Sequence, residues 1–196
     1  SRELDLTLTT RDRSKDKDDE TRVPMCGVPY HSSEAYIARL IARGYKVAIC
    51  DQMEDPALAK GLVKREVTRL VTPGAVTESS MLEESKNNYY ACVFAENGSF
   101  GVSFCDISTG ALCATCFDGA TAEEAVCSEL GAFSPAEVLL GGEALHAELL
   151  KTTLRERLRC CVDTAPENQF EEDMAVAALR VQLGQTPETL GMTDYP

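Results

Sequence analysis

The chain has 196 residues, of which 44% are hydrophobic and 26% charged, ordinary values for a soluble globular protein. No apolar run approaches the roughly 18 residues of a membrane span, and no basic-then-apolar segment at the amino terminus predicts a signal peptide. The nine cysteines are odd in number and scattered through apolar segments, so we expect reduced thiols in a cytoplasmic protein. Secreted and membrane classes are therefore excluded.

The net charge of −13 is unevenly distributed along the chain. Residues 1–86 carry 14 basic and 15 acidic side chains, whereas residues 87–196 carry 5 basic and 17 acidic ones. A field of this sign repels a polyanion, so only the first half is a candidate for contact with nucleic acid. The asymmetry also predicts a domain boundary between the halves.

The first half predicts three strands and one helix. The strands fall at residues 4–10, 45–50 and 66–72, and the helix begins after Ser32 or Ser33 and ends before Gly44. Residues 12–22 are almost entirely charged, and we expect a mobile loop there because such a run has little to bury. These elements make a thin core, so we expect that the amino-terminal part of this domain precedes residue 1.

The second half follows a polar linker at residues 77–88 and predicts an α/β domain with the order β-β-β-α-β-α-β-α. The strands fall at residues 89–95, 100–107, 111–117, 136–140 and 158–162, and the helices at residues 121–132, 143–157 and 170–183. This element order is that of the ribonuclease-H-like fold. We therefore expect a mixed α/β first domain followed by a ribonuclease-H-like domain.

A ribonuclease-H-like domain raises the alternative of a metal-dependent nuclease, which needs several inward carboxylates. The leading strand at residues 89–95 contains no acid, and Asp106 heads a turn where capping its own backbone is the expected role. Cys113 and Cys116 have the spacing of a metal half-site, but residues three apart in a strand point to opposite faces. The sequence therefore predicts no catalytic residue and no metal site.

A basic cluster lies at residues 60–69, with Lys60, Lys64, Arg65 and Arg69 set against Glu66. Two interpretations stay open at this point. The cluster is either a solvated face with internal ion pairs or a set of phosphate contacts, and Lys60, Lys64 and Arg65 are the candidates for the latter.

Several motifs in fixed order resemble the bacterial MutS family, which recognises mismatched base pairs in DNA repair. They are Met-Cys-Gly-Val-Pro-Tyr-His at residues 25–31, Tyr-Lys-Val-Ala-Ile-Cys-Asp-Gln-Met-Glu-Asp-Pro at 45–56, Lys-Gly-Leu-Val-Lys-Arg-Glu-Val at 60–67, Val-Thr-Pro-Gly at 71–74, Phe-Cys-Asp-Ile-Ser-Thr-Gly at 104–110 and Pro-Ala-Glu-Val-Leu at 135–139. The resemblance covers essentially the whole chain. It implies a truncated mismatch-binding domain at residues 1–76, a linker at 77–88 and a connector domain at 89–196.

The resemblance also implies site residues and partners. Thr9, Arg11 and Met25 match positions that approach DNA beside the mismatch, where Arg11 offers a charge-assisted contact. Mismatched double-stranded DNA is the implied ligand of the first domain, and MutL is the implied partner of the connector. The remaining MutS domains and a second MutS subunit are further implied partners.

The family's Phe-x-Glu motif precedes the strand at residues 4–10, and we expect this sequence to lack such a tripeptide altogether. The ATPase domain, which uses ATP and magnesium, would follow Pro196, so we expect no cofactor and no catalysis in this fragment. We expect its DNA binding to be weak, dependent on salt and indifferent to a mismatch.

Overall fold

The computed structural model describes residues 1–10, 23–55 and 61–192. The internal contacts of the chain divide it into two compact units, Ser1–Thr72 and Pro73–Pro196. Each unit is described by itself below. Among the helices of the described residues, none combines the length and apolar character needed to cross a bilayer.

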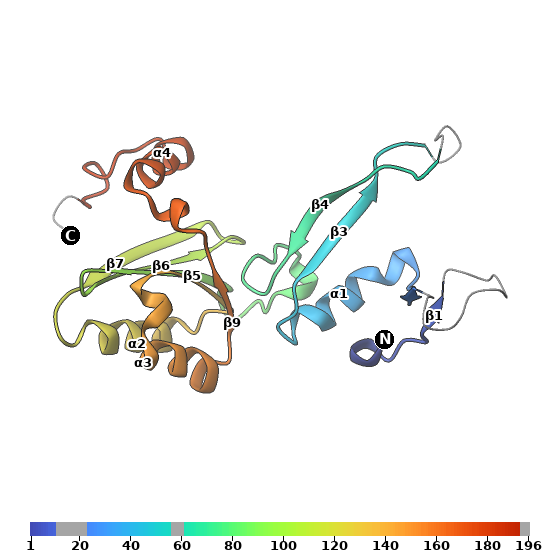
Figure 1. Ribbon diagram of the computed structural model, residues 1–196, viewed down its shortest axis with the longest axis horizontal. Helices are drawn as coiled ribbons and strands as arrows, with labels where there is room; N and C mark the ends of the chain where they lie inside the picture. The colour runs from blue at the N-terminus through green and yellow to red at the C-terminus, as the bar shows by residue number, and fades with distance from the viewer. Residues whose placement is uncertain (11–22, 56–60, 193–196) are drawn as a thin grey trace. The chain divides into compact units, whose positions relative to one another are not determined.

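The first unit consists of one α-helix and two small antiparallel pairs of strands (Figure 1). The pairs are β1 (Thr9–Thr10) with β2 (Pro24–Met25), and β3 (Val47–Gln52) with β4 (Arg65–Val71). The helix α1 spans Ser33–Ile41, and 3-10 turns lie at Arg2–Leu4 and Tyr30–Ser32. Arg43 donates hydrogen bonds to the backbone carbonyl and the carboxylate of Glu3, which holds the first turn beside the helix.

The strand predicted at residues 4–10 is wrong over most of its length. Only Thr9 and Thr10 are extended and paired, because the backbone amides of Leu4 and Leu6 both donate to the carbonyl of Ser1. Asp5 adopts a left-handed conformation with φ 53°, which turns the chain out of a strand. The loop predicted at residues 12–22 lies outside the described residues.

The first unit buries little of its apolar surface. Within its described residues, only Ile41, Val71 and Thr72 are fully buried. Nine large hydrophobic side chains are exposed, namely Leu8, Val23, Met25, Tyr30, Tyr45, Met53, Leu62, Val67 and Leu70.

The second unit contains a five-stranded mixed sheet with the order β7-β6-β5-β8-β9. The strands are β5 (Tyr89–Glu96), β6 (Ser99–Asp106), β7 (Ala111–Phe117), β8 (Glu137–Gly142) and β9 (Cys161–Thr164). The first three form an antiparallel meander, whereas β5, β8 and β9 run parallel to one another. The tight turn between β5 and β6 contains Asn97 and Gly98, both with positive φ, as the Asn-Gly pair predicts.

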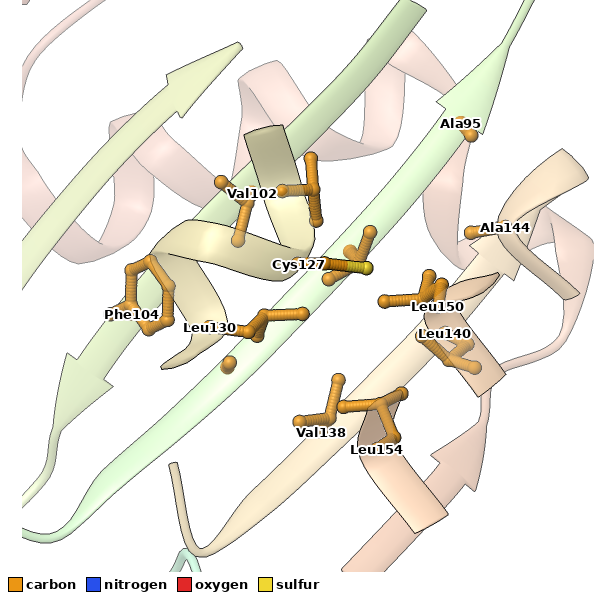
Figure 2. Packing of buried hydrophobic residues seen from close by; sticks show 13 residues of the cluster. Ala95, Val102, Phe104, Cys127, Leu130, Val138, Leu140, Ala144, Leu150 and Leu154 are labelled. Atoms are coloured by element: carbon orange, nitrogen blue, oxygen red, sulfur yellow. The ribbon is translucent and has the colours of Figure 1, made fainter. Parts of the chain in front are cut away.

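Helices cover one face of this sheet and form the core of the second unit with it. The helices are α2 (Ala122–Phe133) and α3 (Glu148–Thr152), which continues as a π-helix at Thr153–Leu158. Figure 2 shows Leu130 of α2 and the side chains of Leu150 and Leu154 packed over the sheet strands. Alternate residues of β5 and β8 point into this cluster, as the two-residue period of a strand requires.

Helix α4 (Glu172–Leu183) lies on the side of the opposite sheet face (Figure 1). It buries no side chain completely, and the 3-10 turn Glu167–Phe170 before it is its link to the sheet. The Phe170 ring stacks on Phe94 at 4.9 Å between centroids. A Cβ atom on Gly141 would overlap the Phe170 ring, so this glycine is needed for the close approach.

The structure corrects two predicted elements of the second unit and shows how α2 begins. The helix predicted at residues 143–157 is divided into a 3-10 turn at Glu143–His146, α3 and the π-helix, because Ala147 has an extended backbone. The strand predicted at 158–162 begins at Cys161, after Arg159 reverses the chain in a left-handed conformation. Thr121 is the N-cap of α2 but makes no side-chain capping hydrogen bond. The mixed α/β class is confirmed.

Candidate nucleic-acid interface

Two of the residues implied as DNA contacts lie directly opposite each other on paired strands. Thr9 of β1 and Met25 of β2 are cross-strand partners, and Thr10 pairs with Pro24. The Met25 side chain is 43% exposed and Thr9 is exposed as well. A strand ladder fixes the relative position of facing side chains, so the two residues form one outward surface. Arg11 and Lys60 lie outside the described residues.

The β3–β4 hairpin carries the described part of the basic cluster. Arg65 pairs with Gln52 across the hairpin and makes no ion pair with any residue that the structure describes. The Lys64 ammonium lies 2.7 Å from a carboxylate oxygen of Glu66, and the Lys64 amide donates to Glu54 at 2.6 Å. All these side chains are well exposed, so the Lys64–Glu66 pair is worth at most about 1 kcal/mol. An anion that binds Lys64 more strongly can displace the Glu66 carboxylate.

Exposed apolar side chains accompany these cations on the hairpin. Met53, Leu62, Val67 and Leu70 are all more than half exposed. A two-stranded ribbon with cationic and apolar side chains offers phosphate contacts and apolar contacts on one element. Among the described cations of the basic cluster, Lys64 is paired with Glu66, Arg69 also has an interaction, and Arg65 makes no ion pair with a described residue.

The two groups of candidate residues do not form one continuous cluster. Figure 1 shows β1 near one end of α1, well apart from the loop end of the β3–β4 hairpin where Lys64 and Arg65 lie. The structure thus brings Thr9 and Met25 together and leaves Lys64 and Arg65 as a separate group. Sequence reasoning missed the Thr9–Met25 pairing, because the charged run of residues 12–22 separates two segments that individually carry little strand pattern.

In the second unit, the carboxylate of Asp106 is used as a hydrogen-bond acceptor within the fold. The residue is 1% exposed and accepts bonds from the backbone amides of Asn88, Ser108 and Thr109 and from the Ser108 hydroxyl. Burial acts to raise the pKa of Asp106, but these hydrogen bonds together lower it below its ordinary value. This geometry is that of a capped turn, as the sequence predicts.

Nothing in the described residues supports the nuclease alternative. No group of three or more His, Cys, Asp and Glu side chains converges there on a position that could hold a metal ion. Cys113 faces the helix side of the sheet opposite Phe104, whereas Cys116 lies opposite Gly101 on the other side. All nine cysteines are free thiols. Burial raises the pKa of Cys92 and of Cys160 to about 11, so these two thiols are neutral at pH 7.

Two Phe-x-Glu tripeptides do occur in the sequence, but both belong to the second unit. They begin at Phe94 in β5 and at Phe170 before α4. The two rings stack on each other, so neither is free to wedge between bases. These tripeptides are packing residues of the sheet and are unrelated to the position where the resemblance places the motif.

Comparison with known proteins gives two family matches in chain order. The family described as MutS domain I matches residues 1–80, and the family described as MutS domain II matches residues 88–189. The chain belongs to the MutS family. The matched ranges include Thr9, Met25 and the β3–β4 hairpin in the first domain and the whole five-stranded sheet in the second.

Individual relatives give the same result at high identity. Proteins named DNA mismatch repair protein MutS from Syntrophomonas wolfei and Ruminiclostridium cellulolyticum are 52% and 44% identical to this chain over its full length. The MutS of Acetivibrio thermocellus is 45% identical over 92% of the chain. The chain spans only 20–22% of the length of these relatives. It therefore corresponds to a fragment, two domains of a much longer MutS protein.

One structural contact absent from the sequence predictions joins two MutS motifs in the second unit. The Glu137 carboxylate of the Pro-Ala-Glu-Val-Leu block accepts a bond from the Gly74 amide of the Val-Thr-Pro-Gly block at 3.0 Å. The Asn88 side chain donates to the Pro73 carbonyl at 2.9 Å. The signal in the sequence was an acid inside an otherwise apolar strand, since a buried carboxylate needs donors.

Proposed function

We propose that this chain is the DNA-contacting and partner-docking part of a MutS mismatch-recognition protein and has no catalysis of its own. In this proposal the first unit contacts double-stranded DNA beside a mismatch. The second unit, whose strand order agrees with a ribonuclease-H-like connector, relays the recognition signal and docks MutL. ATP and magnesium are used elsewhere in the intact protein, which also contributes the remaining domains and a second subunit.

The observation that supports the proposed DNA contact is the pairing of Thr9 with Met25. Two exposed residues that the MutS resemblance assigns to DNA come from separate segments and share one ladder. Arg11 follows Thr10 directly in the sequence and adds a cation to this segment. An exposed apolar Met25 beside polar Thr9 suits a minor-groove surface, where apolar side chains pack against sugars and bases.

The distribution of charge supports DNA contact by the first unit and protein contact by the second. The β3–β4 hairpin presents Arg65 and, once displaced from Glu66, Lys64 to phosphates. Residues 87–196 carry 17 acidic side chains against 5 basic ones, which opposes DNA binding by the second unit. An acidic surface suits protein contact better. The nuclease alternative is not proposed, because the carboxylate it would use, Asp106, is fully engaged.

The test is binding of labelled 20-base-pair duplexes to the 196-residue chain by fluorescence anisotropy over a salt series. We expect weak binding with equal affinity for a homoduplex and a G·T duplex. The double variant Lys64→Ala/Arg65→Ala should make the slope of log K against log salt shallower by nearly 2, at about 0.9 per phosphate contact. The variant Met25→Ala should weaken binding with an unchanged slope, because it removes no charge.

The matched control is Lys86→Ala/Arg180→Ala, which removes the same charge from the second unit. Lys86 pairs with Glu83 on the surface and Arg180 lies on an exposed turn of α4. The DNA affinity and the slope of log K against log salt should both stay at the wild-type value. Equal losses in the two double variants would show that only net charge matters and would overturn the assigned contacts.

A further inference from the structure

The cations of the acidic second half are concentrated in one short segment. Residues 87–196 contain five basic side chains, and four of them, Lys151, Arg155, Arg157 and Arg159, fall within nine residues. This segment includes the end of α3 and the π-helix. The 17 acidic side chains of the same range are spread along it, so ion pairing alone does not explain why four of the five cations lie in one segment.

A hollow with an apolar floor lies next to this segment. Its volume is about 440 Å³, and we call its apolar lining residues, Leu140, Leu154, Cys160 and Val162, the floor and its cationic lining residues the rim. Leu140 and Leu154 are buried members of the core, whereas Val162 of β9 is 41% exposed. Burial raises the pKa of the Cys160 thiol to about 11, so the floor carries no charge at neutral pH. One apolar side chain of a ligand can therefore pack against the floor.

Three of the four cations line the rim of this hollow. Lys151, Arg155 and Arg159 are spaced four residues apart, a spacing that puts side chains on one face of a helix. Arg157 points elsewhere, since its guanidinium nitrogen lies within 3.7 Å of the position that a Cβ on Gly131 would occupy. The hollow thus combines an apolar floor with three cations.

The rim cations are only weakly engaged by neighbouring acids. Lys151 pairs with Glu148 at 2.8 Å and Arg155 with Glu156 at 3.1 Å, and both pairs are largely exposed to solvent. Such pairs are worth less than about 1 kcal/mol and yield readily to a competing carboxylate. Arg159 makes no ion pair with any residue that the structure describes.

The backbone at this rim is also unusual. The helix widens into a π-helix at Thr153–Leu158 and ends at Arg159 with φ 53° and ψ 31°. A non-glycine residue in the left-handed region costs of order 1 kcal/mol, and π-helical turns are frequent at functional sites. Glycine would end the helix without that cost.

We propose that this basic hollow, formed by the floor and rim residues above, binds a short acidic peptide segment of a partner protein. The segment carries two or three carboxylates, which contact the rim, around one large apolar side chain, which fills the floor. A nucleic acid is disfavoured because the acidic charge of residues 87–196 repels an extended polyanion, whereas a short segment stays within the reach of the rim cations. The proposal stands whether or not the first unit contacts DNA.

The test uses the 196-residue chain and three fluorescein-labelled synthetic peptides. They are acetyl-Glu-Leu-Asp-Glu-amide, the same peptide with Gly in place of Leu, and a peptide with Lys in place of every acid. Anisotropy should show saturable binding of the first peptide, at least tenfold weaker binding of the second and no binding of the third at the same concentrations. Equal binding of the first two would overturn the apolar floor as part of the site.

Two variants locate the binding on the protein. Arg155→Glu should weaken binding of the acidic peptide at least tenfold. Its matched control Arg180→Glu also reverses one exposed charge, and it should bind the peptide within twofold of wild type. Arg159→Gly should weaken the peptide and leave the melting temperature equal or higher, which separates loss of the site from loss of the fold. Unchanged peptide affinity in Arg155→Glu and Arg159→Gly would overturn the proposal, as would displacement of the peptide from the hollow by duplex DNA.

Discussion

The two units of this chain differ in how much of their surface folding removes from water. The second unit packs two helices onto one face of a five-stranded sheet and buries a continuous cluster of 13 residues. The first unit has two separate two-stranded sheets, and among its described residues only Ile41, Val71 and Thr72 are buried. Isolated two-stranded sheets are marginal in water. The first unit therefore gains much less from burial than the second, whose buried cluster is continuous.

The largest expected effect is a core truncation in the second unit. Leu130→Ala removes a fully buried side chain of α2 and should lower the free energy of unfolding by about 3 kcal/mol. Val67→Ala truncates an exposed side chain of β4 and should change it by less than about 0.5 kcal/mol. Urea unfolding followed by circular dichroism measures both. Similar losses in the two variants would remove the contrast between the units.

A smaller effect is expected from the buried carboxylate of the second unit. Asp106→Asn leaves a backbone amide facing an amide group and should cost about 2 kcal/mol at pH 7. Because folding lowers the pKa of Asp106, its contribution is present above the unfolded pKa of about 4 and is lost as the pH falls through the lower folded value. The stability difference between wild type and Asp106→Asn should therefore shrink below pH 4.

The measurement is thermal unfolding of both proteins between pH 7 and pH 3. A difference that stays constant over this range would contradict the assigned role. Asp51→Asn is the counterpart in the first unit, since Asp51 accepts a bond from the exposed Thr68 hydroxyl at 2.6 Å. It should cost less than about 1 kcal/mol, because both groups regain water when the bond is lost.

The smallest effect compares two glycines. A Cβ on Gly74 would lie 2.6 Å from a ring carbon of Tyr90 and 2.7 Å from the Glu137 Cβ, so Gly74→Ala should cost about 1 to 2 kcal/mol through crowding. A Cβ on Gly27 would meet nothing within 4 Å, and Gly27→Ala should be neutral. Differential scanning calorimetry distinguishes them. An unchanged melting temperature for Gly74→Ala would mean that residues 73–76 are not firmly packed on the second unit.

The sequence predicted most elements of the second unit because their local signals agree. The strand predicted at residues 111–117 is found with those bounds, and the Asn97-Gly98 turn joins β5 and β6. Apolar alternation and a turn with positive φ act over a few residues and need no knowledge of the rest of the chain. The MutS resemblance was equally local, since it depended on short motifs in order.

Tertiary structure decided what those patterns leave open. The pairing of Thr9 with Met25 and the contact of Gly74 with Glu137 join residues 16 and 63 positions apart, and no local signal specifies such partners. The same holds for the basic hollow, whose rim comes from α3 and the π-helix and whose floor includes β8 and β9. Periodicity fixes which face of an element is apolar, but only packing fixes which element meets it.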